Sequence, residues 1–407
     1  MKNVIDILKE RGFFQQCTDE AGLRHRLNQE PRTFYVGVDP TGPSCHIGHI
    51  VPLYASAHLQ RAGHTPIILM GGGTALIGDP SGKMEMRKMI DQVQITRNIE
   101  SMKRQLGRII DFENSNAIVV NNADWLIPLN YIEFLRDIGQ HFSVNRMLTF
   151  EAYRQRLEKG LSFLEFNYQL LQSYDFLELY RRYNCLLQIG GDDQWGNIVA
   201  GMELIRRMER AATFGLTFPL ITRSDGAKMG KTEKGALFLD ETLTPVYDFF
   251  QYWRNVPDDD VERFLLLFTF LDAEECRDLG TASDINASKE RLAYEVSQII
   301  HGQQKAVAAR DAARSVFSGD GDESGIPATR LTSAQFDEGI GIVDLFVMTG
   351  LCPSRSEARR LIQQGGARIN RERIDNMETM IASSHIIDGK IILKAGKKRF
   401  HRIDVVE

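Results

Sequence analysis

The sequence predicts an α/β fold in which a parallel sheet with helices on both faces is followed by a helical region and a small basic α+β module. Three observations support this prediction. Short β-branched and aromatic runs alternate with helical patterns over about the first 243 residues. Residues 244–317 are helical in pattern, with few strand signals. An acidic stretch rich in Gly and Ser, residues 318–327, then leads into a segment with one helical run and short alternating strands.

Four apolar runs are predicted to form the strands of the sheet. Residues 32–38 (RTFYVGV) are β-branched and aromatic. Residues 65–70 (TPIILM) lack the alternation of a half-exposed strand, so we expect them to be buried on both faces. Residues 117–120 and 185–189 are shorter runs of the same kind. Because helical patterns lie between these runs, neighbouring strands are expected to be parallel.

The intervening helices are predicted from apolar residues at helical spacing. The first extends from residue 47 to residue 62, and Gly63 ends it. Residues 1–14 alternate charged and apolar side chains, which predicts an amphipathic helix rather than a signal peptide, and no apolar run is long enough to predict a membrane span. The other predicted helices of this half are residues 92–110, 128–139, 162–183 and 195–210.

Composition indicates an ordinary globular protein. Hydrophobic residues make up 43% and charged residues 25% of the 407 residues, which excludes a mainly disordered chain, a collagen-like repeat and a small disulfide scaffold. The five cysteines are widely separated and form no CxxC pair, so neither a disulfide framework nor a metal site is predicted and a reducing cytoplasm is expected. The pattern changes predict four regions: residues 1–243, residues 244–317, a linker at 318–340, and residues 341–407.

Charge is unevenly distributed along the chain. The net charge is −5, which alone argues against a nucleic-acid partner. Residues 341–407, however, carry 12 Lys and Arg against 8 Asp and Glu, whereas the remainder carries 37 against 46. A basic C-terminal module on an acidic body indicates that only part of the surface meets a polyanion.

The first chemical signal is HIGH at residues 46–49, which follows the first predicted strand and opens a helix. A strand–turn–helix unit directs backbone N–H groups and the positive end of the helix dipole to one place, which suits phosphate. Two histidines add donors for charge that develops on a phosphoryl group, and Gly48 permits the close approach of a ligand. Two surface histidines in a loop are the alternative interpretation.

The second signal is KMGKT at residues 228–232, between Gly226 and Gly235. Two lysines three residues apart in a glycine-rich loop can close on a triphosphate, although taken alone such a loop is often only solvated. The two motifs are 182 residues apart, and their order is that of the HIGH and KMSKS signatures of class I aminoacyl-tRNA synthetases. Their combination therefore resembles that class.

Further stretches make the chain similar to the bacterial tyrosyl-tRNA synthetase family. They are YVGVDPT at 35–41, GDPSGK at 78–83 and QIGGDDQWGN at 188–197. The resemblance covers nearly the whole chain and implies a Rossmann-like catalytic domain with an inserted dimerisation segment, a helical anticodon-side domain and an S4-like RNA-binding domain. It also implies the activity of a tyrosine–tRNA ligase, which activates L-tyrosine with ATP, releases pyrophosphate and transfers tyrosine to tRNA(Tyr).

One predicted helix carries candidate ligands for the amino acid. Tyr168, Gln172 and Asp175 stand at positions i, i+4 and i+7, which places three polar groups on one face. Their apolar neighbours favour partial burial over a solvent face, and buried polar groups need partners. By resemblance, Tyr35 and Asp175 face the phenolic hydroxyl, and phenylalanine would leave both unpaired. The implied tyrosine-binding residues are Tyr35, Asp79, Tyr168, Gln172, Asp175 and Gln188.

The resemblance places ATP, with Mg²⁺, across the sheet and implies no tightly bound cofactor. The carboxylate of the amino acid attacks the α-phosphate itself, so catalysis rests on positioning and charge stabilisation. The implied catalytic residues are Thr41, His46, His49, Lys228, Lys231 and Thr232. The implied ATP-binding residues are Gly37, Asp39, Gly48, Lys83, Arg87, Gly191, Asp193 and Lys231. The two signatures comprise Pro40, His46, Ile47, Gly48 and His49, and Lys228, Met229, Gly230, Lys231 and Thr232.

The chain departs from the family pattern at two places. The second signature has Gly230 where KMSKS has serine, while both lysines are kept and Thr232 retains a hydroxyl. Asp192 precedes Asp193 and forms a pair of carboxylates near the expected ATP, which either favours Mg²⁺ or leaves Asp192 as a solvated loop residue.

Contacts with tRNA are predicted at two places, and a homodimer is expected from the family with residues 139–163 as the contact. Arg206 and Arg207 extend a helix that leaves the active site, where they either meet an acceptor stem or complement the helix dipole. The C-terminal module is expected to present a patch that contacts phosphates. Its predicted residues are Arg355, Arg359, Arg360, Arg368, Lys397, Lys398 and Arg399.

Three other interpretations remain at this stage. Tyr35 and Asp175 argue against a tryptophanyl-tRNA synthetase, and the chain length with its S4-like segment argues against a small HxGH nucleotidyltransferase. The third is a synthetase-derived RNA-binding or splicing protein, against which the intact histidines and lysines argue.

Overall fold

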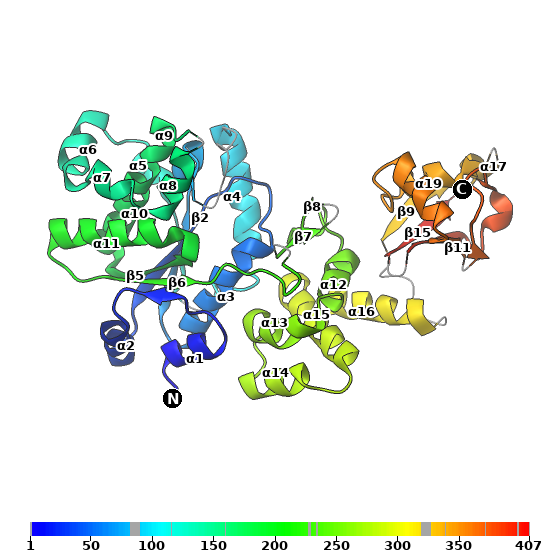
Figure 1. Ribbon diagram of the computed structural model, residues 1–407, viewed down its shortest axis with the longest axis horizontal. Coiled ribbons are helices and arrows are strands. Elements are labelled where there is room, and N and C mark those ends of the chain that lie inside the picture. Colours follow the sequence, from blue (N-terminus) through cyan, green and yellow to red (C-terminus); the bar gives the residue numbers. More distant parts are fainter. Residues whose placement is uncertain are drawn as a thin grey trace. The chain divides into compact units, whose positions relative to one another are not determined.

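A computed structural model describes most of the chain as two compact units (Figure 1). The first comprises residues 1–231, 236–240 and 257–285, and the second comprises residues 232–235, 241–256 and 286–407. For Ala152, Gln155, Lys231, Thr232, Gly235 and residues 315–318 the backbone alone is described. The described residues are 2–81, 90–114, 116–158, 160–226, 229–232, 235–318, 327–337, 339–370, 372–396 and 399–406.

Within the described part of the first unit, six strands form one sheet in the order β1-β6-β5-β2-β3-β4. All neighbouring strands are parallel except β1 and β6, which are antiparallel. The predicted parallel sheet is therefore confirmed. The strands are β1 (Gln16–Cys17), β2 (Thr33–Val38), β3 (Thr65–Met70), β4 (Ile118–Asn121), β5 (Cys185–Gly191) and β6 (Phe214–Phe218).

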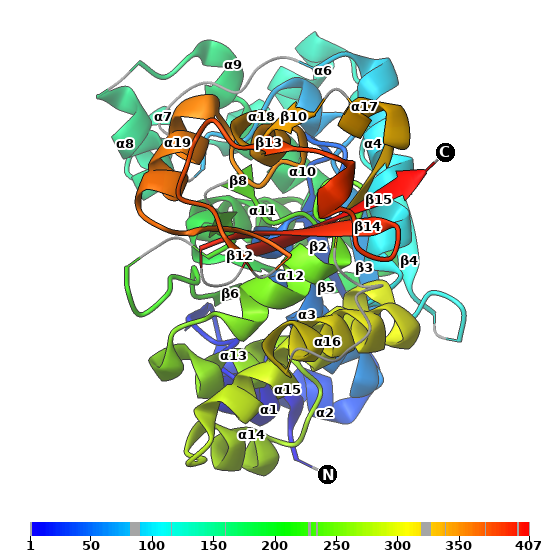
Figure 2. The ribbon, with the colours of Figure 1, turned by 90° about the vertical axis from the view of Figure 1, so that its right-hand side faces the viewer.

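Helices cover both faces of this sheet, with α10 and α11 on one side and α3 on the other (Figures 1 and 2). The helices of this unit are α1 (Val4–Glu10), α2 (Glu20–Gln29), α3 (Ile47–Arg61), α4 (Gln92–Leu106), α5 (Ala123–Leu126), α6 (Tyr131–Asp137), α7 (Val144–Met147), α8 (Glu151–Leu157), α9 (Phe163–Phe166), α10 (Tyr168–Tyr183), α11 (Trp195–Glu209), α13 (Val261–Phe268) and α14 (Ala273–Gly280). Its 3₁₀ turns are η1 (Thr74–Leu76), η2 (Gly139–His141), η3 (Asp192–Gln194) and η4 (Asp258–Asp260).

Local chemistry explains where the main elements begin and end. His46 caps the N-terminus of α3, and Gly63 takes a φ of +95° just beyond its end, as the sequence predicts. β3 is buried on both faces, as its unbroken apolar run predicts. The predicted helix over 162–183 is two helices, because Asn167 ends α9 and precedes α10.

Two strands of the sheet are not predicted from the sequence. β1 has only two residues, too few for a periodic signal. β6 (FGLTF) is entirely buried, but it is short and contains Gly215, whose missing side chain leaves room for Ile198 of α11. A Cβ at Gly215 would lie 2.3 Å from Ile198 Cγ2, so close packing of helix on strand requires glycine here.

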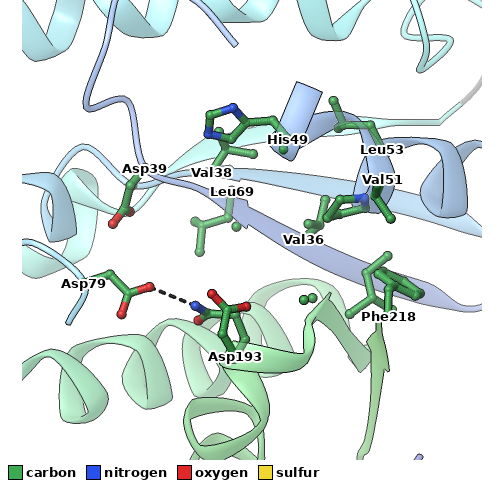
Figure 3. A pocket seen from close by; sticks show the side chains of 18 of the residues that line it. Val36, Val38, Asp39, His49, Val51, Leu53, Leu69, Asp79, Asp193 and Phe218 are labelled. Carbon is green, nitrogen blue, oxygen red and sulfur yellow. Dashed lines mark hydrogen bonds between the residues drawn. The ribbon is translucent and has the colours of Figure 1, made fainter. Parts of the chain in front are cut away.

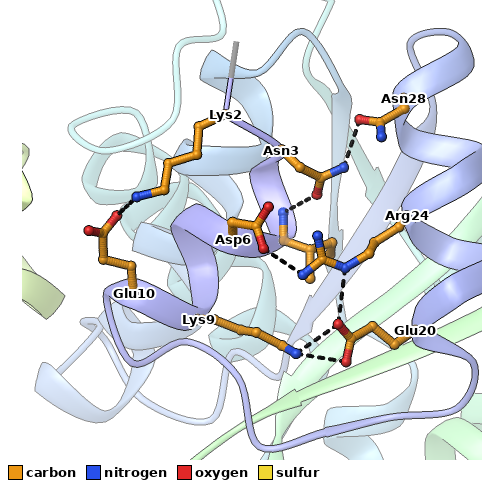
Figure 4. Close-up of polar contacts among 9 residues, drawn as sticks. Lys2, Asn3, Asp6, Lys9, Glu10, Glu20, Arg24 and Asn28 are labelled. Carbon is orange, nitrogen blue, oxygen red and sulfur yellow. Dashed lines mark hydrogen bonds and ion pairs between the residues drawn. The ribbon is translucent and has the colours of Figure 1, made fainter.

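The N-terminal helices are joined by a cluster of polar contacts (Figure 4). Arg24 of α2 pairs with Asp6 of α1 at 2.6 Å, and Lys9 pairs with Glu20 at 2.7 Å. Asn3 caps α1 by accepting a hydrogen bond from the Ile5 backbone N–H. Such exposed pairs each contribute little to stability, and their combined role is to orient α1 against α2.

The second unit contains three helices and a C-terminal module. α12 (Val246–Arg254) packs against α16 (Gln303–Ser318), and α15 (Ile285–His301) contacts both through side chains such as His301 on Phe249 and Glu290 on Arg314. The predicted single helical region 244–317 is thus divided, because α13 and α14 belong to the first unit. Two short strands, β7 (Lys231–Thr232) and β8 (Gly235–Ala236), fall between β6 and α12 in the sequence.

The C-terminal module packs a sheet against short helices, and its long pair β14–β15 is visible in Figure 2. In its described part, five strands follow the order β12-β11-β14-β15-β9. The elements are β9 (Ala328–Thr332), α17 (Ser333–Asp337), β10 (Ile340–Gly341), α18 (Ile342–Met348), α19 (Arg355–Gln363), β11 (Ala367–Ile369), β12 (Glu372–Arg373), β13 (Met380–Ile381), η5 (Ser383–His385), β14 (Lys390–Ala395) and β15 (Arg399–Val406).

The predicted linker at 318–340 is wrong in its second half. β9 lies within it and pairs in parallel with β15, and α17 follows directly. The sequence signal is weak because four of the five β9 residues are not buried, with Leu331 alone facing the core. In the part of the chain that the structure describes, no helix is long and apolar enough to cross a membrane.

Candidate active site

A cavity of about 540 Å³ opens at the carboxyl ends of β2 and β5 (Figure 3). The chain proceeds outward from these neighbouring strands in opposite directions, through β3 and β4 on one side and through β6 on the other. Ligands of open α/β sheets bind at such a reversal of strand order. Residues of α3, α10 and the segment after β3 complete the lining.

The floor of the cavity holds two buried polar atoms with no hydrogen bond to any described residue. Tyr35 on β2 and Gln188 on β5 are register partners, so their side chains lie on the same face of the sheet. Tyr35 is 1% exposed and Gln188 is 3% exposed. Within the described residues, neither the Tyr35 hydroxyl nor Gln188 Oε1 has a partner. Because a buried unpaired polar atom is costly, both point to a polar ligand.

Asp175 of α10 lies beside Tyr35 and is held by two donors. Trp125 Nε1 donates to Asp175 Oδ1 at 2.8 Å, and Asn122 Nδ2 donates to Oδ2 at 2.9 Å. Burial raises the pKa of Asp175 to about 8, and the two hydrogen bonds oppose that rise. Burial and the nearby Asp175 carboxylate raise the pKa of Tyr35 well above its ordinary value. The pocket therefore combines a neutral phenol with a carboxyl group of fixed orientation.

A second set of hydrogen bonds links this end of the cavity to the end of β2. Tyr168 donates from its hydroxyl to Asp39 Oδ2 at 2.9 Å, and Thr74 donates to Asp39 Oδ1 at 2.8 Å. The hydroxyl of Thr74 in turn accepts a hydrogen bond from Asn122, which also holds Asp175. Asp39 and Asp175 therefore belong to one continuous network.

The opposite wall carries a network of amides. Asn197 of α11 donates to Gln172 Oε1 at 3.0 Å and to Gln194 Oε1 at 3.1 Å. Gln194 donates to Asp79 Oδ2 at 2.8 Å, the contact drawn as a dashed line in Figure 3. Three predicted tyrosine ligands, Tyr168, Gln172 and Asp79, thus line one cavity, and each is already oriented by a neighbour.

The HIGH segment presents two imidazole rings to the cavity. His46 Nδ1 accepts from the Gly48 backbone N–H at 3.0 Å, and His49 Nδ1 accepts from the His46 backbone N–H at 3.1 Å. An Nδ1 that accepts cannot carry the proton, so in each neutral ring the proton is on Nε2, which makes Nε2 a donor. The ring centroids are 4.0 Å apart. Each ring therefore carries an Nε2–H donor close to the N-terminus of α3.

Two glycines keep the cavity open to a flat ligand. Gly37 lies near the carboxyl end of β2 and is exposed, and a Cβ there would meet nothing within 4 Å. Gly48 is exposed under the ring of His46, and a Cβ there would lie 2.8 Å from His46 Cε1. Beside Gly191, burial and the Asp79 carboxylate raise the pKa of Asp193.

Asp192 joins strands of the sheet to each other. Its Oδ1 accepts a hydrogen bond from Gln16 of β1 at 2.8 Å and another from Thr217 of β6 at 2.9 Å. Asp192 therefore ties the edge strand to the sheet and is not a solvated loop residue.

The remaining predicted ATP and catalytic residues are placed less completely. Met229 lines the cavity, whereas Pro40 and Thr41 are absent from the described lining, and the Pro40 carbonyl accepts a hydrogen bond from Asn98. For Lys231 and Thr232 only the backbone is described, as β7. Predicted residues outside the described chain are Lys83, Arg87, Lys228, Lys397 and Lys398.

Comparisons with known proteins agree with this geometry. The model of class I tRNA synthetases (W and Y) matches residues 27–318, and the model of the tyrosine–tRNA ligase SYY-like C-terminal domain matches residues 321–403. The tyrosine–tRNA ligase of Treponema denticola is 56% identical over 404 residues, covering 99% of both chains. The chain belongs to the tyrosine–tRNA ligase family. A relative from Clostridium kluyveri, also named tyrosine–tRNA ligase, is 52% identical and again covers 99% of both chains.

Solved structures of the family share the fold. A C-terminally truncated mitochondrial tyrosyl-tRNA synthetase from Aspergillus nidulans superposes with a TM-score of 0.70 at 29% identity, covering 78% of this chain and 95% of that one. The corresponding truncated protein from Coccidioides posadasii gives a TM-score of 0.66 at 29% identity, covering 76% and 91%. The fold and the enzyme class predicted from the sequence are thus confirmed.

The cavity and the hydrogen-bond networks behind its lining contain residues that sequence reasoning missed. Asn122 and Trp125 follow β4, and their one available signal is that position, because ligands of parallel sheets gather where strands end. Thr74 follows β3 in the same way. Gln194 and Asn197 stand inside the QIGGDDQWGN motif, but the motif alone assigns them no partner.

The predicted RNA-binding residues lie on two separate elements. Arg206 and Arg207 stand at the C-terminal end of α11, where both pair with Glu203, at 3.0 and 3.5 Å. In the C-terminal module, Arg368 of β11 lies directly opposite Lys394 of β14. Burial and Arg368 lower the pKa of Lys394. The other described arginines of the predicted patch are Arg355, Arg359 and Arg360 on α19 and Arg399 on β15.

Proposed function

We propose that the cavity binds L-tyrosine and ATP side by side and joins them as tyrosyl-adenylate. The observation that carries this proposal is the pair of buried, unpaired polar atoms on Tyr35 and Gln188, next to the carboxyl of Asp175. The phenolic hydroxyl and the ammonium group of tyrosine supply partners for such atoms, whereas phenylalanine would leave the Tyr35 hydroxyl unpaired. The family assignment supports the same substrate.

Different residues of the cavity bind the phenolic hydroxyl and the ammonium group of tyrosine. Tyr35 and Asp175 take the phenolic hydroxyl, with Asn122 and Trp125 holding the carboxyl in place. Asp79, Tyr168 and Gln172 take the ammonium group, which needs acceptors, and Gln188 contributes its Oε1 atom. The proposed tyrosine-binding residues are Tyr35, Asp79, Tyr168, Gln172, Asp175 and Gln188.

ATP lies over the exposed Gly37 and against Gly48, at the carboxyl ends of the neighbouring strands β2 and β5. The open space above Gly37 supports this position, because any side chain there would project into the cavity. His46 and His49 donate from Nε2 to the phosphates, and Mg²⁺ accompanies them. Asp39, Gly191 and Asp193 border the nucleotide. The roles of Thr41, Lys83, Arg87, Lys228, Lys231 and Thr232 rest on the resemblance of their motifs.

The reaction needs no protein nucleophile. A carboxylate oxygen of tyrosine bonds to the α-phosphorus, the bond from that phosphorus to the bridging oxygen breaks, and pyrophosphate leaves. Negative charge shifts toward the leaving oxygens, which donors at the N-terminus of α3 stabilise. Holding both substrates in one cavity lowers the entropic part of the barrier.

Pyrophosphate exchange with each of the twenty amino acids tests this proposal. We expect exchange that depends on tyrosine and is far weaker with phenylalanine or tryptophan. Exchange driven equally well by another amino acid would contradict the assignment of the pocket. Absence of exchange with any amino acid, in a folded protein, would favour an RNA-binding protein derived from a synthetase.

Binding of tRNA(Tyr) is assigned to surfaces outside the cavity. The facing cations Arg368 and Lys394 repel each other unless an anion such as an RNA phosphate lies between them, which supports the C-terminal module as an RNA contact. Arg206 and Arg207 are proposed to meet the acceptor stem.

Removal of the C-terminal module tests whether adenylate formation and tRNA binding belong to different parts of the chain. A chain that ends at Ser318, the last residue of α16, should keep tyrosine-dependent pyrophosphate exchange and lose most tRNA tyrosylation. The reason is that every proposed tyrosine and ATP ligand precedes this point while the excess positive charge follows it. Tyrosylation at increasing salt measures the loss. A truncated chain that charges tRNA as well as the full chain would contradict the proposal.

A homodimer is proposed from an apolar surface on the first unit. Exposed apolar side chains occur on α6 to α9 and just before them, and the predicted contact at 139–163 covers only their second half. Ile132→Glu, at a residue 69% exposed, should shift the sedimentation of the protein to that of a monomer. The exposed apolar residues are Ile127, Tyr131, Ile132, Leu135, Val144, Leu157 and Phe163.

A cytoplasmic location is proposed from the cysteines. All five are free, and four of them are buried. Unpaired thiols of this kind are typical of a reducing compartment.

A further inference from the structure

The two signature segments are joined to each other by backbone hydrogen bonds. Leu237 N donates to the carbonyl of Gly230 at 2.8 Å, and the Leu237 carbonyl accepts from Ile47 N at 3.2 Å. Leu239 N donates to the carbonyl of Cys45 at 2.9 Å. The stretch that follows KMGKT thus forms a short antiparallel ladder on the stretch that begins HIGH, and we call residues 44–47 with 237–240 the signature ladder.

The signature ladder has a side-chain anchor on α4. Gln105 Oε1 accepts from Cys45 N at 2.8 Å and lies 3.0 Å from Ser44 Oγ. Ser44 Oγ also accepts from Asp240 N at 3.2 Å, and Ser44 is 2% exposed. Gln105 Oε1 therefore holds one strand of the ladder directly, and the Ser44 hydroxyl, which shares its proton between Gln105 Oε1 and the Cys45 carbonyl at 2.7 Å, links that strand to Asp240. Gln105 itself does not line the described cavity.

Gly230 of the KMGKT segment lies against Ile47 of HIGH. Its φ is +76°, and a Cβ at this position would lie 2.9 Å from Ile47 Cβ. Gly226 has a similar φ of +79°, but a Cβ there would meet nothing within 4 Å. Both positions favour glycine for their backbone, whereas only Gly230 requires it for the contact with Ile47.

We propose that Gln105 is a positioning residue for adenylate formation, acting through the signature ladder. It fixes the backbone from which His46 and His49 project, relative to the segment that carries Met229 and Gly230. This inference rests on the proposed function of the cavity. A displacement of about 1 Å in such a constellation can cost on the order of a hundredfold in rate. The tyrosine end is held by different residues, so its affinity should not depend on Gln105.

Three variants of the full chain test this role. Gln105→Met keeps the volume but removes the acceptor, leaving Cys45 N without its partner. Gln105→Glu keeps an oxygen that can accept the same hydrogen bonds. Gln60→Met is the matched control, because Gln60 Oε1 accepts from a backbone N–H, that of Asp111 at 3.0 Å, at the far end of α3.

Single-turnover adenylate formation and equilibrium tyrosine binding are the two measurements. We expect Gln105→Met to slow adenylate formation by roughly tenfold to a hundredfold with unchanged tyrosine affinity, and Gln105→Glu and Gln60→Met to remain near wild type. A wild-type rate in Gln105→Met would overturn the proposal. A parallel loss of tyrosine affinity and rate in Gln105→Met would also overturn it, since a merely structural residue has that effect.

If Gln105→Met does not fold, a second pair of variants perturbs the signature ladder at the KMGKT segment instead. Gly230→Ala and Gly226→Ala impose the same backbone strain, but only the first adds a clash with Ile47. We expect adenylate formation to be slower in Gly230→Ala than in Gly226→Ala, and equal rates would contradict a role for the ladder. Wild-type protein without tyrosine-dependent exchange would defeat the proposed function itself, whereas a fully active Gln105→Met would defeat this inference alone.

Discussion

The cavity has a proposed tyrosine end, around Asp175, and a proposed phosphate end, at His46 and His49. The side chains of the two ends are held in different ways. At the tyrosine end, buried side chains hold one another, as Asn122 and Trp125 hold Asp175. At the phosphate end, the backbone holds the side chains, because the Nδ1 atoms of His46 and His49 both accept from main-chain N–H groups. The first arrangement is a closed network of side chains, and the second depends on the path of two chain segments.

This difference separates specificity from rate. A buried network that is already in place penalises a substrate lacking the hydroxyl before any chemistry occurs. Donors that are carried on the backbone of two segments instead act where charge develops during phosphoryl chemistry. Substitutions at the two ends should therefore change different kinetic constants.

The largest expected effect separates the two ends by substitution of the histidines. His46→Ala and His49→Ala should each slow adenylate formation by about 10²–10³-fold, the range seen when a donor to developing charge is removed. Tyrosine affinity should hardly change, because the described hydrogen bonds of both rings are with the backbone of HIGH. Single-turnover adenylation and equilibrium tyrosine binding check this. Wild-type rates of adenylation in both variants would show that His46 and His49 do not stabilise the charge on the phosphates.

The second effect concerns the hydroxyl of the substrate. Asp175→Ala should reduce the ratio of kcat/KM for tyrosine over phenylalanine by roughly tenfold to a hundredfold, since phenylalanine leaves the buried carboxyl without the substrate hydroxyl, and a buried polar group left unsatisfied costs about 1–3 kcal/mol. Glu178→Ala is the control, because Glu178 is a carboxylate of the same helix that pairs with Arg182 away from the cavity. An unchanged ratio in a folded, active Asp175→Ala variant would show that Asp175 does not discriminate the hydroxyl.

The sequence predicts well which residues of one helix lie together at the tyrosine end. Tyr168, Gln172 and Asp175 share a helix face, which is a property of spacing alone, and the structure places all three in the lining of the cavity. Asn122 and Trp125 could not be found in the same way, because they precede Asp175 by 53 and 50 residues and meet it only when β4 and α10 pack.

Longer-range pairings were missed for the same reason. Nothing in KMGKT or HIGH indicates that Leu237 will pair with Ile47, and nothing in the pattern of α4 marks Gln105 as the anchor. The parallel sheet, by contrast, follows from the alternation of apolar runs and helices, which is visible along the chain. The strand β9 was not predicted, and its residues were assigned to a linker, because its pairing with β15 joins segments far apart in sequence.

The smallest expected effect is a dependence of stability on pH that belongs to the tyrosine end alone. Burial gives the Asp175 carboxyl a pKa of about 8 in the folded protein, against an ordinary value of 3.8. Between these values the unfolded chain has lost the proton that the folded chain keeps. The free energy of unfolding therefore falls as pH rises through this window, by about 1.4 kcal/mol between pH 6 and pH 7.

Asp175→Asn removes this titration while keeping the shape of the side chain. Its free energy of unfolding, relative to wild type, should rise by about 1.4 kcal/mol between pH 6 and pH 7, whatever the offset between the two proteins at pH 6. Urea unfolding at the two pH values measures the change, with Glu133→Gln, at an exposed residue of α6, as the control for the loss of a carboxylate outside the cavity. A parallel pH dependence in wild type and Asp175→Asn would mean that Asp175 is ionised throughout the window. In that case the donors Asn122 and Trp125 outweigh burial, and the tyrosine end holds a full negative charge before the substrate arrives.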